Sequence, residues 1–120
     1  MKNFVGIDLG TTNSAICSYD GSETRIWKSP EQTDVTPSEI YIDRRSKYLG
    51  KRAYDSAPYN PDNAATLFKR LMGTSTPIHF SAMNLTKTPE ECSAEILKLL
   101  FGYLPEEIRK VKNITNLPNI

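Results

Sequence analysis

The sequence predicts a single α/β domain that begins with a β-hairpin. Residues 4–9 and 14–19 are strand-like runs of apolar and small side chains, and the short turn between them contains glycine. Residues 89–103 show the 3.6-residue apolar spacing of an amphipathic helix. A length of 120 residues, with 38% hydrophobic and 24% charged residues, suits one domain with one core.

The first part of the chain is predicted to form a meander of antiparallel strands. After the hairpin, Asp20 and Gly21 mark a turn, and residues 24–27 return as a third strand. Beyond a polar loop, the β-branched and aromatic residues at 39–42 predict a further strand. Residues 48–50 then close a small excursion of the chain.

A short amphipathic helix is predicted near the middle of the chain. Residues 60–63 look like a loop that ends in a helix cap, and residues 64–72 have apolar side chains at helical spacing before Gly73. A loop that contains Pro77 and His79 is expected to follow.

The strongest helix signal lies at residues 89–103. Thr88 is an N-cap residue and Glu91 stands three positions later, which together form a capping box with a proline at the first helical position. Residues 105–109 are expected to form a final helical turn, whereas residues 113–118 predict no clear element.

Composition and charge exclude several classes of function. Fifteen Lys and Arg against fourteen Asp and Glu give a net charge of +1, so no field of one sign points to nucleic acid or a membrane surface. No segment approaches the roughly 20 apolar residues of a membrane span, and residues 1–10 lack the apolar run of a signal peptide. Cys17 and Cys92 lie far apart without a CxxC pair, which favours reduced thiols in a cytoplasmic protein.

The residues that carry chemistry lie at the turn of the predicted hairpin. Asp8 stands near the end of the first strand, just before the turn Gly10-Thr11-Thr12-Asn13. Glycine permits close backbone approach and unusual dihedral angles, and the threonines add hydroxyl donors, so such a turn directs N–H groups at an anion. A polyphosphate suits this turn. Asp8 would then hold Mg²⁺ through water, because Mg²⁺ dehydrates reluctantly.

The same residues also fit a polar hairpin turn without a ligand, in which Asp8 is simply solvated at a strand end. Residue spacing alone leaves both interpretations open. The turn is neither a Walker loop, which requires GxxxxGK[ST], nor a dinucleotide-binding GxGxxG motif. Those two mechanisms are therefore not supported.

Residues 6–14, with the sequence GIDLGTTNS, resemble the first phosphate motif of the DnaK-type seventy-kilodalton heat-shock chaperones. Further matches follow in the family's order and spacing at residues 36–38, 48–50, 60–63 and 67–73, and residues 89–103 resemble the family's next helix less specifically. The resemblance implies a ribonuclease-H-like or actin-like ATPase fold, a mixed sheet begun by the meander. Residues 1–120 would be the amino-terminal part of the nucleotide-binding domain, with no peptide-binding domain.

The resemblance also implies roles for individual residues. The residues that match the loop around the β- and γ-phosphates of ATP or ADP are Gly10, Thr11, Thr12 and Asn13. Asp8 matches the carboxylate that serves hydrated Mg²⁺. Lys69 matches the catalytic lysine that approaches the γ-phosphate, where it would neutralise charge as the phosphoryl group leaves. Without the resemblance, Lys69 would be interpreted as a solvated lysine on a helix face.

Other residues that could suggest a site are interpreted as structural or solvated. His79 has no nearby ligand partner in the sequence, and Trp27 is expected to pack against the meander. The basic runs at 51–52 and 110–112 are short and lack aromatic residues for base stacking, so solvated faces are expected.

The chain departs from the family pattern at two places. Asp34 and Val35 stand where the family usually has a basic residue, and residues 114–118 only partly match a family strand. The second phosphate hairpin, the adenosine motif, the second catalytic carboxylate and the peptide-binding domain have no counterpart. We therefore expect weak nucleotide binding by this chain and assign ATP hydrolysis to a full-length parent.

In such a parent, ATP hydrolysis would switch the affinity for unfolded peptides, and the resemblance implies J-domain cochaperones and nucleotide exchange factors as partners. One alternative is a sugar or acetate kinase, or a polyphosphatase, of the same superfamily, although residues 60–73 fit the chaperones better. Another is a non-catalytic module, either a truncated product or an interaction domain.

Overall fold

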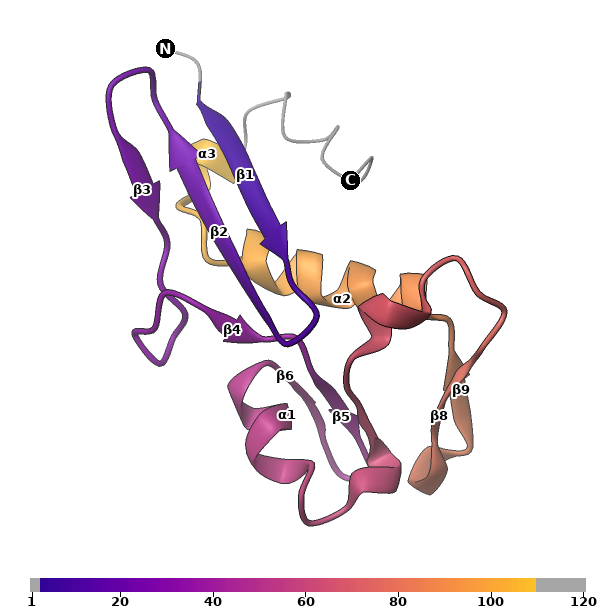
Figure 1. Cartoon of the computed structure of the whole chain (residues 1–120). Helices are drawn as coiled ribbons and strands as arrows, with labels where there is room; N and C mark the ends of the chain where they lie inside the picture. The colour runs from indigo at the N-terminus through magenta and orange to yellow at the C-terminus, as the bar shows by residue number, and fades with distance from the viewer. Residues whose placement is uncertain (1–2, 110–120) are drawn as a thin grey trace.

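The computed structural model describes residues 3–109 (Figure 1). Its largest sheet contains, in spatial order, β1 (Phe4–Leu9), β2 (Asn13–Tyr19) and β3 (Thr24–Ile26), and β4 (Thr36–Pro37) pairs with the first residues of β2. The strands β1 and β2 are antiparallel and their last aligned pair is Leu9 with Ser14. The predicted hairpin and third strand are therefore confirmed.

One face of this sheet is buried by α2 (Pro89–Phe101), which crosses it and continues toward the far side of the molecule (Figure 1). The β1 side chains that pack against the core are Val5, Ile7 and Leu9. The buried residues of α2 that face them at helical spacing are Cys92, Ile96 and Leu100. Burial of each large aliphatic side chain of this kind stabilises a fold by roughly 1.5–3 kcal/mol. The predicted helix is confirmed, and its apolar stripe carries the core.

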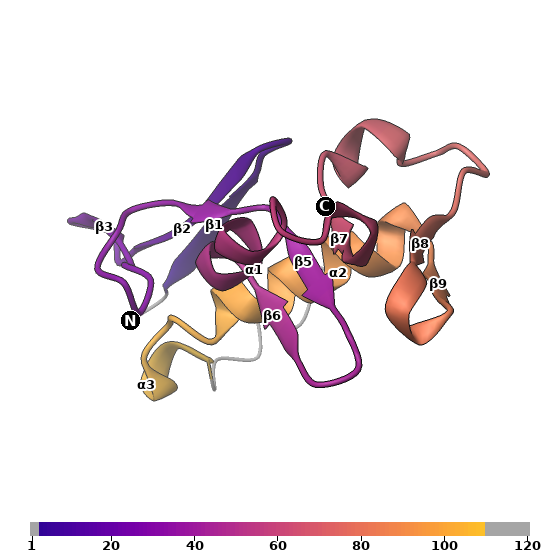
Figure 2. The same ribbon diagram turned by 90° about the horizontal axis from the view of Figure 1, so that it is seen from below.

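A second sheet lies at the other end of the molecule, with β5 (Ile40–Ile42) between β6 (Lys47–Leu49) and β7 (Ala64–Ala65). The helix α1 (Lys51–Ser56) packs against β5 and β6 and also contacts β4 (Figure 2). The sequence does not predict α1, because Ala53 is its one buried residue and no apolar period results.

The helix predicted at residues 64–72 is wrong. Ala64 and Ala65 form β7 and pair with β5, and the segment Phe68–Leu71 is the short 3₁₀ turn η2. Leu67 between them has a φ of 56°, in the left-handed region, which a helix interior excludes. A segment this short does not nucleate a helix on propensity alone, so strand pairing and the burial of Phe68 decide its conformation.

The loop predicted around Pro77 and His79 is confirmed only in part, because residues 75–77 belong to no helix or strand whereas His79 lies in a strand. The strands β8 (Ile78–Phe80) and β9 (Leu85–Lys87) form a two-stranded hairpin through the 3₁₀ turn η3 (Ser81–Met83). Three-residue strands are too short to show a clear alternation of apolar and polar side chains. His79 is exposed, as expected, and its Nδ1 lies 3.0 Å from the Thr86 hydroxyl.

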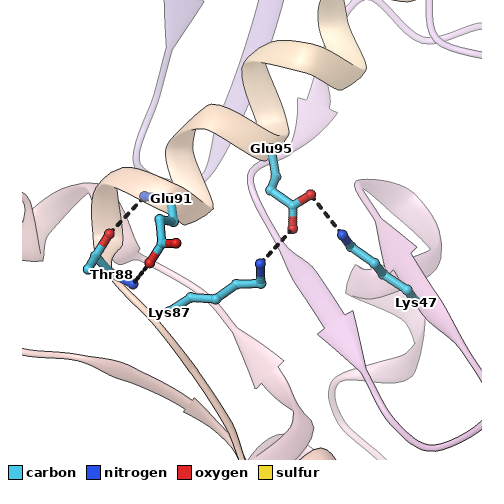
Figure 3. A network of polar contacts seen from close by, with 5 residues as sticks. All are labelled: Lys47, Lys87, Thr88, Glu91 and Glu95. Carbon is cyan, nitrogen blue, oxygen red and sulfur yellow. Dashed lines mark hydrogen bonds and ion pairs between the residues drawn. The ribbon is translucent and has the colours of Figure 1, made fainter.

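The start of α2 carries the predicted capping box (Figure 3). The Thr88 hydroxyl accepts from the Glu91 amide at 3.0 Å, and the Thr88 amide donates to the Glu91 carboxylate at 2.8 Å. One turn later, Glu95 lies between two lysines, with Lys47 of β6 at 2.8 Å and Lys87 of β9 at 3.6 Å. This carboxylate therefore joins α2 to both smaller sheets. The expected final turn is α3 (Glu106–Arg109).

The mixed sheet expected from the family resemblance is not seen within residues 3–109, where three antiparallel sheets are found instead. Parallel strands require long crossover connections, and the strands paired here are linked locally or by loops that reverse their direction. The same residues contain no helix with the length and apolar composition needed to cross a membrane. The predictions for residues 110–112 and 113–118 lie outside the described residues.

Candidate functional site

The predicted turn residues lie together in the loop that joins β1 to β2. Asp8 is an exposed residue of β1, Gly10 and Thr11 are half-buried, and Thr12 and Asn13 are exposed. The hairpin brings all five into one short segment, because the last aligned strand pair closes directly beneath the loop. The loop faces solvent on one side and contacts β4 on the other.

The backbone around residue 10 leaves no room for a side chain, so glycine is required there. A Cβ atom at this position would lie 2.1 Å from the backbone oxygen of Asn13, closer than any real contact. Gly10 does not have a left-handed φ, so the space available for a side chain, and not a positive φ, is what restricts this position to glycine. The close approach of an anion to Gly10 stays a prediction. The loop is therefore wound more tightly than any other residue at this position would allow.

Ser38, the residue after β4, donates hydrogen bonds to two carbonyl groups of the loop. Its amide donates to the Thr12 oxygen at 2.9 Å, and its hydroxyl donates to the Gly10 oxygen at 2.9 Å. The hydroxyl of Ser14 lies 2.7 Å from the Ser38 hydroxyl, and both side chains are 1% exposed. Two of the loop's oxygens are thus directed toward β4.

The position of these oxygens determines where the neighbouring amides point. Every peptide bond among residues 3–109 is trans, and across a trans peptide the C=O and the following N–H point in opposite directions. Since the Gly10 oxygen faces Ser38, the Thr11 N–H faces away from Ser38. Within the described part of the chain, this amide donates to no acceptor. It is an available donor for an anion at the loop.

Asp8 has a chemical environment that fits an indirectly held cation. Its carboxylate has no hydrogen-bond or ion-pair partner among the residues described. It borders a mainly apolar hollow of about 330 Å³ on the outer face of the sheet, together with Cys17 and Ile26. No group of three His, Cys, Asp or Glu residues that could hold a metal ion occurs in residues 3–109. A single free carboxylate suits Mg²⁺ bound through water with phosphate oxygens as the other ligands.

Lys69 lies outside the hairpin, on η2. In both views η2 lies next to the loop between β1 and β2 (Figures 1 and 2). Lys69 is exposed and has no ion-pair partner among the described residues. The turn is held on α2, since the Gly73 amide donates to Glu90 at 3.2 Å and the Ser93 hydroxyl lies 3.3 Å from the Met72 sulfur. The fold thus places η2, which carries the exposed Lys69, beside the loop.

The strand β4, which directly precedes Ser38, is itself held by contacts with other parts of the fold. The hydroxyl groups of Thr36 and Tyr103 are 2.9 Å apart, and burial raises the pKa of Tyr103 above its usual value. Gly50 also packs closely against Thr36, because a Cβ atom at residue 50 would lie 2.8 Å from the methyl group of Thr36. The support of the loop therefore extends from β4 to Tyr103, which follows α2.

Sequence reasoning did not identify Ser14 and Ser38 as part of this site. Ser14 belongs to the motif at residues 6–14, and Ser38 to the matched segment at 36–38, so both lay within recognised motifs. Their contact spans 24 positions in sequence, and no local pattern reveals such a pair. The signal available was a buried-strand pattern in β2 that places serine where an aliphatic residue is expected.

Other residues considered from the sequence have structural surroundings. The Trp27 indole donates to the Ser18 hydroxyl at 2.8 Å and packs on the meander, as predicted. Cys17 and Cys92 are both free thiols. Burial raises the pKa of Cys92 to about 11, so this thiol is protonated at neutral pH.

Comparison with known proteins gives a consistent family assignment. The family model for Hsp70 protein matches residues 4–102. The chain is similar to the chaperone protein DnaK of Metamycoplasma hominis, with 35% identity over 108 residues, 89% of this chain and 18% of that protein. It is also similar to the chaperone protein DnaK of Mycoplasmopsis agalactiae, with 38% identity over 104 residues, 87% of this chain and 17% of that protein. The chain thus spans less than a fifth of the length of these relatives, and it belongs to the Hsp70 family.

Proposed function

We propose that residues 1–120 are the amino-terminal part of the ATPase domain of an Hsp70 chaperone, and that the loop between β1 and β2 binds the β- and γ-phosphates of ATP or ADP. The observation that carries this proposal is the Thr11 amide, which faces away from β4 without an acceptor in the described chain. Backbone amides in a tight, glycine-containing loop are common ligands of phosphate. Family membership supports the same assignment.

The phosphate contacts would be shared among the residues of the loop. The Thr11 amide would donate to a phosphate oxygen, and the Thr11 and Thr12 hydroxyls would add donors at its edge. The loop is held in place before the ligand arrives, because Ser38 fixes two of its carbonyl groups. Such preorganisation reduces the free energy that binding loses to ordering of the loop.

Asp8, through Mg²⁺, and Lys69 would offset the negative charge of the phosphates bound at the loop. Asp8 would hold Mg²⁺ through water, and when bound the ion neutralises phosphate oxygens. Lys69 is free of ion pairs in the described part of the chain, so no salt bridge must break before it contacts an anion. Its role as a catalytic residue would be to stabilise the charge of the transferring phosphoryl group.

The activity of a longer protein is part of this proposal. A parent with the ribonuclease-H-like or actin-like ATPase fold would hydrolyse ATP between two lobes and so switch its affinity for unfolded peptides. Its partners would be those of the family, namely J-domain cochaperones and nucleotide exchange factors. The Hsp70 match favours this function over a sugar or acetate kinase.

Calorimetric titration of the chain with Mg²⁺ and ATP tests the proposal. We expect weak binding that Thr11→Ala and Lys69→Ala each reduce roughly tenfold or more, since hydrogen bonds to charged groups contribute about 1.5–3 kcal/mol. Lys98→Ala is the matched control, because Lys98 is an exposed lysine of α2 without an ion-pair partner in the described residues. Equal losses for Lys69→Ala and Lys98→Ala would remove Lys69 from the site. No heat of binding in any variant would favour a non-catalytic module.

A further inference from the structure

The segment at residues 36–38 matches the family but has no role in the phosphate contacts described above. Its last residue, Ser38, lies just outside β4 and makes two hydrogen bonds with the loop. The amide and the hydroxyl of this one residue bind two different loop carbonyls, those of Thr12 and Gly10, both at 2.9 Å.

The direction of the hydrogen bonds at Ser38 follows from the donors available. A serine hydroxyl has one proton, and a carbonyl oxygen only accepts. The Ser38 proton is therefore given to the Gly10 oxygen, and the Ser14 hydroxyl, 2.7 Å away, must donate to Ser38. The result is a chain of two hydrogen bonds from Ser14 through Ser38 to Gly10, in which each bond polarises and strengthens the other.

We infer that Ser38 is a positioning residue for the phosphate loop: it holds the Gly10 and Thr12 carbonyls toward β4 and thereby turns the Thr11 amide toward the ligand. This inference deepens the proposed function and depends on it for the identity of the ligand. Ser38 itself does not contact the phosphate in this arrangement. Its side chain is only 1% exposed, and its hydroxyl proton is donated to the Gly10 oxygen.

The supports of Ser38 make it effective as an anchor. The hydroxyl of Thr36, two residues earlier, lies 2.9 Å from that of Tyr103, which follows α2, and Gly50 packs against the same threonine. Ser38 thus belongs to a segment whose position is fixed by contacts with two distant parts of the fold. Loss of this hydroxyl would leave the half-buried Gly10 oxygen and the buried Ser14 hydroxyl without partners, which favours a rearranged loop.

The experiment compares Ser38→Ala with Ser29→Ala. Ser29 is also buried, at 2% exposed, but its hydroxyl binds Thr33 in the connection between β3 and β4. We expect Ser38→Ala to shift the amide NMR signals of residues 10–13 in the nucleotide-free chain and to weaken Mg-ATP binding about fivefold or more. We expect Ser29→Ala to lower stability while leaving the loop signals and the affinity unchanged.

The inference is overturned if the loop signals of Ser38→Ala match those of the wild type, or if Ser29→Ala shifts them equally. Should Ser38→Ala fail to fold, Ser14→Ala removes only the donor into Ser38 and should shift the same signals by a smaller amount; an unchanged spectrum overturns the inference. Absence of Mg-ATP binding by the wild-type chain would contradict the proposed function alone, because the nucleotide-free signals still decide the role of Ser38.

Discussion

Gly10 shows at the scale of one residue how the backbone of the loop constrains the sequence. A methyl group at Gly10 would meet the Asn13 backbone oxygen at 2.1 Å, and backbone moves less readily than a side chain. At Gly6, which lies within β1, an added Cβ would lie 3.2 Å from the Cys17 sulfur, which a small side-chain adjustment relieves. The two glycines therefore differ in what they permit.

We predict that Gly10→Ala lowers the free energy of unfolding by about 1–3 kcal/mol, the usual cost of overpacking, and that Gly6→Ala lowers it by less. Urea denaturation of the two variants and the wild type measures both changes. Gly10→Ala should also alter the amide signals of residues 11–13. Equal destabilisation by the two variants would show that the loop adapts to a side chain at Gly10.

The site residues were predictable to different degrees. Asp8 and the turn at residues 10–13 are adjacent in sequence, so their grouping in one loop follows from the hairpin pattern. Lys69 required the family resemblance, because an exposed lysine on a short turn has no distinguishing local pattern. Ser38 could not be assigned, since its bond to Gly10 spans 28 positions and depends on the pairing of β4 with β2.

At the scale of elements, the capping box of α2 links a local sequence signal to stability. The Thr88 hydroxyl and the Glu91 carboxylate exchange hydrogen bonds with each other's amides. The hydrogen bond from the Thr88 amide lowers the pKa of Glu91 below its ordinary value of 4.5. A lowered folded-state pKa stabilises the fold above the unfolded pKa, and this contribution is lost as the pH falls through the folded pKa.

We predict that Thr88→Ala lowers the free energy of unfolding by about 1 kcal/mol at neutral pH. Glu91→Gln should retain an acceptor for the Thr88 amide but no longer titrate. The free energy of unfolding of this variant should therefore fall less than that of the wild type as the pH drops below about 4.5. Denaturation at several pH values measures this difference. Thr76→Ala, at an exposed loop position, is the control. An identical acid profile for Glu91→Gln and the wild type would contradict a stabilising charge on Glu91.

The elements that were mispredicted share a physical cause. The 3₁₀ turn η2 replaced a predicted helix, because Ala65 is drawn into pairing with Ile40 and Phe68 into the core. These are tertiary interactions that a periodic pattern cannot contain. The helix α2 was predicted correctly because its cap, its proline and its apolar stripe are all local signals that agree.

At the scale of the whole molecule, α2 connects the parts that form the candidate site. It covers β1 and β2, holds η2 through Glu90 and Ser93, and joins the two smaller sheets through Glu95 (Figure 3). One oxygen of Glu95 is buried without a hydrogen-bond partner, and Lys87 stands 3.6 Å from it. The sequence predicted this helix but not its partners, which come from four separate segments: the hairpin of β1 and β2, the end of η2, β6 and β9.

The central claim is that the amides of the loop between β1 and β2 bind phosphate. Amide NMR spectra of the labelled wild-type chain, titrated in parallel with Mg-ATP and with Mg²⁺ plus adenosine, test it most directly. The account predicts saturable shifts at Thr11 and its neighbours in the loop with Mg-ATP, and none there with adenosine, because the phosphates are the groups recognised. Loop signals that stay fixed in Mg-ATP, or that move equally with adenosine, would contradict it.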